Sequence, residues 1–172
     1  MPVRNGLAAS ADGRFIVAAT GEYHESSGHR AIIEVFGFET GRQQVLEDRG
    51  AVYGMWRVVL SLNDRLASTV QVKGRSGILA RDLAARETLF RKQGFDAYWV
   101  RGLAISHDGR QVVSGDEKGF LRPWRVGNGA SLLERQESMP IQSVAISSDN
   151  KRVAWSLFDG VVKVASLVPG SR

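Results

Sequence analysis

The chain has 172 residues and carries 23 basic against 18 acidic side chains, a formal net charge of +5. A content of 43% hydrophobic and 24% charged residues is typical of a folded domain and argues against disorder. The absence of cysteine excludes disulfides, thiolate metal sites and cysteine nucleophiles. Apolar runs are too short to span a bilayer, and residues 1–5 lack the apolar core of a secretory signal. We therefore expect a cytoplasmic protein that makes no use of a membrane.

Four segments along the chain share one pattern, in which two short apolar runs flank a polar turn. These segments are 7–17, 59–67, 103–113 and 144–154. Each has an acidic or amide residue at the same place in its turn, at successive intervals of 51, 45 and 41 positions: Asp12, Asn63, Asp108 and Asp149. Asp-Gly and Asn-Asp pairs tolerate positive φ at low cost, so each segment predicts a β-hairpin.

Further apolar runs follow each hairpin after another turn. A third run stands at 31–36, 77–80, 120–124 and 161–164, and a weaker fourth run at 44–46, 88–90 and 132–133. Each unit thus holds about four short strands in roughly 40–45 residues. Pro123 removes a ladder donor from its strand, so we expect a bulge or a break in pairing there. Sustained helical spacing is absent, and residues 82–87 predict a turn after a strand, so the fold class is all-β.

These units resemble the WD40 repeat family over nearly the whole chain. The Ser-x-Asp-Gly-Arg turn of that family stands at 10–14 and 106–110, with a looser copy at 147–151. The Trp-Asp end of the third strand is degenerate, at Phe36-Gly37, Arg81-Asp82, Trp124-Arg125 and Ala165-Ser166. The Gly-His signature before the first strand is missing, and Asp96 and Glu137 lie near its expected place. The buried Asp-His-Ser/Thr-Trp network of the family is therefore not assigned to this chain.

The resemblance implies a partial β-propeller of about four four-stranded antiparallel blades in one domain, 1–172. The blades are expected at roughly 1–49, 50–93, 94–136 and 137–172, with the last blade lacking its outer strand. An arc of this kind leaves apolar faces at both ends. We expect either two copies that close head-to-tail as a homodimer with an eight-bladed ring, or a chain that is part of a larger propeller. A distorted four-bladed ring is the third alternative.

The resemblance also implies a binding face. Loops between second and third strands share that face with loops that lead into first strands, and it binds peptides or proteins. Arginine and exposed aromatic side chains are frequent interface anchors, although Tyr98 and Trp99 equally fit packing beneath a strand. By position, the predicted partner-binding residues are Tyr23, His24, His29, Arg30, Tyr53, Lys73, Arg75, Tyr98, Trp99 and Lys118.

The longest loop is expected at 22–30, where two histidines lie near Glu22 and Glu25. Their spacing matches no zinc pattern, so we expect a solvated polar loop without a metal. His107 fits a turn position better than a catalytic base, and nucleophile-elbow and paired-carboxylate motifs are absent.

The sequence therefore predicts a non-catalytic scaffold that binds a protein or peptide partner and uses no cofactor. Three alternatives stay open. The first is RNA or DNA binding through the surface arginines, which are scattered singly along the chain. The second is a truncated fragment of a larger WD40 protein. The third is an enzyme on a propeller frame, which fold alone does not exclude.

Overall fold

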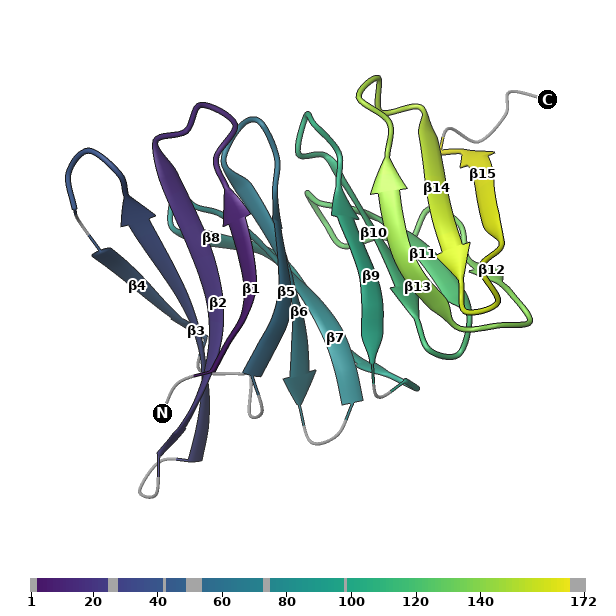
Figure 1. Ribbon diagram of the computed structural model, residues 1–172, viewed down its shortest axis with the longest axis horizontal. Helices are drawn as coiled ribbons and strands as arrows, with labels where there is room; N and C mark the ends of the chain where they lie inside the picture. The colour runs from purple at the N-terminus through teal and green to yellow at the C-terminus, as the bar shows by residue number, and fades with distance from the viewer. Residues whose placement is uncertain are drawn as a thin grey trace.

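A computed structural model describes residues 3–24, 28–41, 43–48, 54–72, 75–97 and 99–167. Within these ranges the chain forms four antiparallel sheets and contains no helix, which confirms the predicted all-β class (Figure 1). A membrane-spanning helix is accordingly not found in the described part of the chain.

The sheets follow one another in chain order, and in each sheet consecutive strands pair. The first sheet contains β1 (Val3–Ala9), β2 (Phe15–His24), β3 (Gly28–Gly37) and β4 (Gln43–Asp48). The second contains β5 (Gly54–Leu60), β6 (Arg65–Val72), β7 (Arg75–Asp82) and β8 (Glu87–Phe95). The third contains β9 (Val100–Ile105), β10 (Gln111–Asp116), β11 (Phe120–Arg125) and β12 (Arg135–Gln136). The fourth, within the described residues, contains β13 (Ile141–Ile146), β14 (Arg152–Leu157) and β15 (Val162–Ser166).

The four sheets stack face to face in a row, with the first and fourth sheets at opposite ends (Figure 1). Their first strands meet in succession, β1 with β5, β5 with β9 and β9 with β13, and form one edge of the stack, which we call the inner edge. One sheet cannot cover both of its own faces, so the core lies between neighbouring sheets. Its buried members include Val17, Ile33 and Leu79 in the first gap, Phe95, Val112 and Trp124 in the second, and Val113, Ile141 and Trp155 in the third.

The predicted hairpins are confirmed at the turns between first and second strands, which line the upper edge in Figure 1. In the third sheet, the Ser106 hydroxyl donates to Asp108 Oδ1 (2.6 Å) and accepts from the N–H of Gln111 (2.9 Å). Such bonds satisfy polar groups that the turn would otherwise leave unpaired. The same pair of bonds recurs in the other three turns, at Ser10 with Asp12, Ser61 with Asn63, and Ser147 with Asp149.

Successive turns also bond to one another. The N–H of Leu62 donates to the carbonyl of His107 (3.1 Å), and Asn63 Nδ2 donates to the carbonyl of Asp108 (3.1 Å). The N–H of His107 in turn donates to Asn150 Oδ1 (2.9 Å). These hydrogen bonds connect the second turn to the third and the third to the fourth. They therefore fix the relative positions of those three sheets along the strand direction.

The turn hydrogen bonds make stability depend on pH. The Ser147 hydroxyl and the N–H of Lys151 lower the pKa of Asp149, and the N–H of Arg14 and the Ser10 hydroxyl lower that of Asp12. A carboxyl whose folded pKa lies below its unfolded value of about 3.9 stabilises the fold above that pH and loses the effect as pH falls. We expect the free energy of unfolding, measured in urea, to decrease below about pH 4. A variant with Asp12→Asn and Asp149→Asn should show a shallower decrease, and an unchanged slope would contradict this origin.

Two local predictions are corrected by the structure. The predicted loop 22–30 is largely a hairpin, because β2 and β3 continue their pairing through Glu22 with Arg30, Tyr23 with His29 and His24 with Gly28. Backbone pairing requires no apolar side chains, so a polar run does not end a ladder. Polar composition alone therefore overestimated the length of this loop.

The fourth strand of the third sheet also differs from the prediction, because it lies at 135–136 rather than at 132–133. Leu132 does donate its N–H to the carbonyl of Pro123 (2.9 Å), but proline has no N–H to return the bond. Pairing with β12 therefore starts only at Leu121, opposite Arg135. The pairing of β11 with β10 continues through Pro123 without a bulge, so the break is confined to the edge of β11 that faces β12.

Candidate functional site

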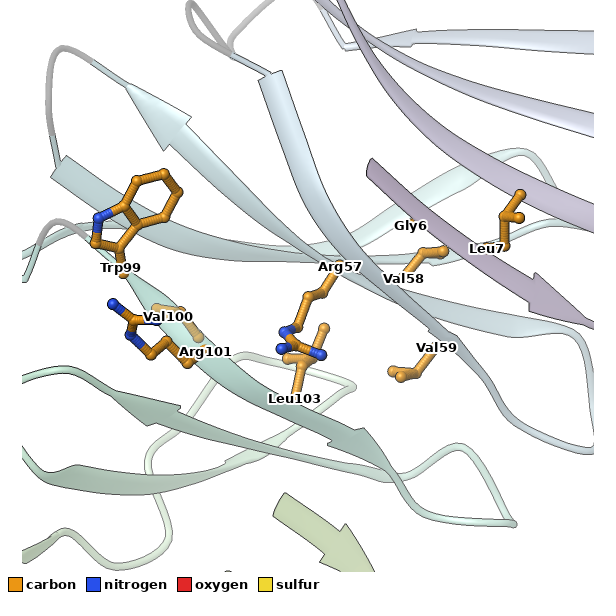
Figure 2. Close-up of a pocket in the computed structure, with 9 residues that line it drawn as sticks. All are labelled: Gly6, Leu7, Arg57, Val58, Val59, Trp99, Val100, Arg101 and Leu103. Atoms are coloured by element: carbon orange, nitrogen blue, oxygen red, sulfur yellow. The ribbon is translucent and has the colours of Figure 1, made fainter. Parts of the chain in front are cut away.

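A groove runs across the inner edge of the stack, over β1, β5 and the start of β9 (Figure 2). It encloses about 450 Å³ and we call it the inner-strand groove. It is lined by Gly6, Leu7, Arg57, Val58, Val59, Trp99, Val100, Arg101 and Leu103.

Irregular pairing places two arginines in this groove. The pairing of β5 with β6 shifts register between Met55 and Val58, and Arg57 lies in that interval. The pairing of β9 with β10 shifts between Val100 and Gly102, which leaves Arg101 as the extra residue. A β-bulge breaks the alternation of a strand and redirects its side chains. Each bulge thus carries one cation in an otherwise apolar first strand, and Figure 2 shows both side chains on neighbouring strands.

The groove is positively charged and has apolar walls. Arg57 and Arg101 are exposed, and neither forms an ion pair with a carboxylate of the described residues. Among the described residues that line the groove there is no aspartate or glutamate. Trp99 is half-buried and its carbonyl accepts a hydrogen bond from the N–H of Glu117 (3.1 Å). Two cations without local counter-charges favour negatively charged ligands.

Three of the predicted binding residues, Arg75 at the start of β7, Trp99 just before β9 and Lys118, lie within the described residues, at the edge of the stack opposite the Ser-Asp turns. Lys118, in the turn between β10 and β11, pairs with Asp96 after β8 (2.6 Å). The hydrogen bond and charge of Lys118, and the charge of Arg75, lower the pKa of Asp96. Arg75 and Lys118 therefore both act on one carboxylate, while Trp99 lines the inner-strand groove.

The other predicted binding residues are not placed by the structure. The side chains of Tyr23, His24, His29 and Arg30, and the whole of Tyr53, Lys73 and Tyr98, lie outside the described residues. Arg57 and Arg101 were not predicted as site residues. The signal that marks them is a single cation inside the apolar run of a first strand, at 55–60 and 99–103.

A second cavity of about 620 Å³ lies at the Ser-Asp turns of the second, third and fourth sheets. Much of its polar surface, including Asn63, Asp108 and Asn150, already bonds within or between turns. His107 is exposed in this turn region. Among the described side chains no group of three metal-ligating residues comes together. The inner-strand groove, whose cations are not engaged in this way, is therefore the stronger candidate site.

Comparison with known proteins yields a similar fold but no relative in sequence. No family model and no curated protein sequence matches the chain. Among solved structures, the chain is similar to the crystal structure of the computationally designed Ika4 protein, with a TM-score of 0.72 and 21% identity. The match covers 96% of this chain and 92% of that one. At this identity the similarity concerns the fold alone.

Proposed function

We propose that the chain is a non-catalytic, cytoplasmic binding scaffold, built as a partial WD40-like β-propeller whose four sheets are its blades. Its inner-strand groove binds a protein or peptide partner, and the neighbouring loops around Trp99 and Lys118 extend the contact. The observation that carries this proposal is the groove itself, where Arg57, Arg101 and Trp99 line one cavity and the described lining residues include no acidic side chain.

Two features support the WD40-like assignment. The four Ser-Asp or Ser-Asn turns repeat one hydrogen-bond pattern at the position where the family has its Ser-x-Asp-Gly-Arg turn. In the third sheet, Trp124 Nε1 donates to Ser114 Oγ (3.0 Å), which corresponds to the Ser-Trp link of the network that the resemblance implies. Asp116, the last residue of β10, bonds to Arg122 instead of a histidine.

The chemistry of the groove favours an acidic peptide segment. Guanidinium groups bind carboxylates through paired, charge-assisted hydrogen bonds. Trp99 and the valines of β5 supply a surface for apolar side chains between those carboxylates. A segment that alternates acidic and apolar residues would satisfy both features. If the chain is part of a larger WD40 protein, the same groove serves that protein.

A binding titration with a labelled peptide that alternates glutamate with leucine tests this function. We expect the double variant Arg57→Ala with Arg101→Ala to weaken binding at least about tenfold, because both ionic contacts are lost. The matched control, Arg125→Ala with Arg152→Ala, removes the same charge at exposed positions outside the groove and should bind as the wild type does.

The same titration distinguishes a nucleic-acid ligand. A labelled oligouridine RNA that binds more tightly than the peptide, with affinity that falls steeply with salt, would favour the RNA alternative. Equal loss of peptide binding in both double variants would show that net charge, rather than the groove, attracts the peptide. Either outcome overturns the proposed function.

A further inference from the structure

One position of the repeat is buried in three sheets and exposed in the first. Phe38, Leu83, Val126 and Leu167 are equivalent, because the N–H of each donates to the carbonyl of a residue in the Ser-Asp turn of its own sheet. Leu83, Val126 and Leu167 are 9%, 0% and 6% exposed, whereas Phe38 is 61% exposed. Leu83, Val126 and Leu167 each belong to the core between their own sheet and the preceding sheet. Phe38 belongs to the first sheet, which has no preceding sheet in this stack.

Leu7 on β1 shows the same contrast. Its register position corresponds to Val58, Leu103 and Val144, which are all buried in the gaps between sheets. Leu7 is 68% exposed. Ile16 is only half-buried, although its equivalents on the second strands of the other sheets are buried. Leu7, Ile16 and Phe38 together form what we call the first-sheet face.

At the opposite end of the stack, the fourth sheet exposes the face that a following sheet covers in the other three sheets. Ala145, Ala154 and Val164 pair across β13, β14 and β15, and Val162 lies on the same face as Val164. These four residues form the fourth-sheet face, on which Val164 is 63% exposed. The equivalent rows of the other sheets, which the next sheet covers, are Ala8, Val17 and Val35, then Val59, Ala67 and Ala80, then Ala104, Val113 and Pro123.

The internal contacts show how the two halves fit. Between the third and fourth sheets, Val144 approaches Gly102 so closely that a Cβ there would lie 2.5 Å from Val144 Cγ2. Branched side chains of one sheet therefore pack onto small residues of the preceding sheet. The fourth-sheet face presents alanines and valines, with Arg152 on the same side of the sheet, and the first-sheet face presents larger apolar residues, with Glu34 on the same side. Each end face thus presents the kind of side chains that packs against the other end face in the internal gaps.

We infer that a second copy of this chain docks head-to-tail, with the first-sheet face of one copy on the fourth-sheet face of the other. The occupant is a second copy because both end faces belong to the same chain. Together they repeat the pair of faces that pack against each other in each of the three internal gaps. Apolar burial on both sides stabilises the contact. A head-to-tail contact closes when its rotation allows. Leu7 also lines the inner-strand groove, whereas Phe38 and the fourth-sheet face lie outside it, so variants at Phe38 and Val164 test this contact without altering the groove.

Sedimentation velocity over a range of concentrations tests the inference. We expect the wild type to form dimers. Phe38→Lys alone and Val164→Lys alone should each raise the dimer dissociation constant about a hundredfold or more, because each buries an unpaired charge. A mixture of the two variants should form one-to-one complexes. The chain modified on its fourth-sheet face keeps an intact first-sheet face, and the chain modified on its first-sheet face keeps an intact fourth-sheet face, so these two intact faces can still dock. A contact between two identical faces would predict instead that one of the two variants still dimerises alone, and this result would overturn the inference.

Leu62→Lys and Leu133→Lys are the matched controls, because both leucines are exposed but lie away from the end faces. These variants should dimerise as the wild type does. Circular dichroism checks that every variant folds. If one of the two face variants fails to fold, the single variants Phe38→Glu and Val162→Lys replace them. A wild type that sediments as a monomer at all concentrations, or variants that still dimerise alone, would overturn the inference.

Discussion

Replacing Arg122 with methionine should lower the free energy of unfolding by about 3–5 kcal/mol, because it leaves a buried charge without its partner. Arg122 pairs with the carboxylate of Asp116, which is almost fully buried in the third sheet. That carboxylate also accepts hydrogen bonds from the N–H groups of Lys118 and Phe120, at 3.0 Å each. Urea denaturation at neutral pH measures the loss.

The variant Asp116→Asn with Arg122→Met is the control for that prediction. Asparagine keeps an oxygen for the two backbone N–H groups but carries no charge, so the double variant should be more stable than Arg122→Met alone. Arg122 also lies over the ring of Phe120, at 4.2 Å from its centroid, and methionine retains part of that packing. A loss below about 1 kcal/mol for the single variant would show that solvent screens the pair.

Trp124→Ala should cost a similar amount, about 3–5 kcal/mol, because it removes a large side chain from the gap between two sheets. The indole of Trp124, from β11 in the third sheet, stacks on Phe95 of the second sheet with a centroid separation of 5.5 Å. Its Nε1 donates to Ser114 Oγ (3.0 Å). Thermal and urea denaturation, each followed by circular dichroism, measure the cost.

Trp124→Phe separates the two contributions of this side chain. Phenylalanine keeps an aromatic ring against Phe95 but loses the hydrogen bond, so the loss should be clearly smaller than for alanine. Leu133→Ala, at an exposed position between β11 and β12, should leave stability nearly unchanged. If Trp124→Ala destabilised the chain no more than Leu133→Ala, the second and third sheets would not share a core.

The hairpin turns could be predicted from sequence because their signals are local. A serine two residues before an aspartate or asparagine makes its hydrogen bonds within a few residues, as at Ser106 and Asp108. The alternation of apolar residues on either side then assigns the first and second strands. These features recur at similar intervals, so one turn supports the interpretation of the next.

The groove could not be predicted in the same way. Arg57 and Arg101 are redirected by bulges, and a bulge depends on how two strands pair rather than on either strand alone. The shift of β12 has a similar origin, because it follows from the missing N–H of Pro123 on the strand opposite. Apolar end faces were expected from the sequence, but the residues that form them are found only by comparing exposure at equivalent positions, such as Phe38 and Val126.

The central claim is that four sheets stack in chain order as an open row. Spin-label distances test it most directly, with labels on cysteines introduced in pairs at the exposed turn positions Ala11, Leu62, His107 and Ser148 of a chain that has no cysteine of its own. Labelled chain is diluted with unlabelled chain so that only distances within one molecule are measured. The structure predicts short distances between labels on neighbouring turns, and the longest distance between positions 11 and 148. A distance between 11 and 148 as short as those between neighbours, or no ordering along the chain, would contradict the account.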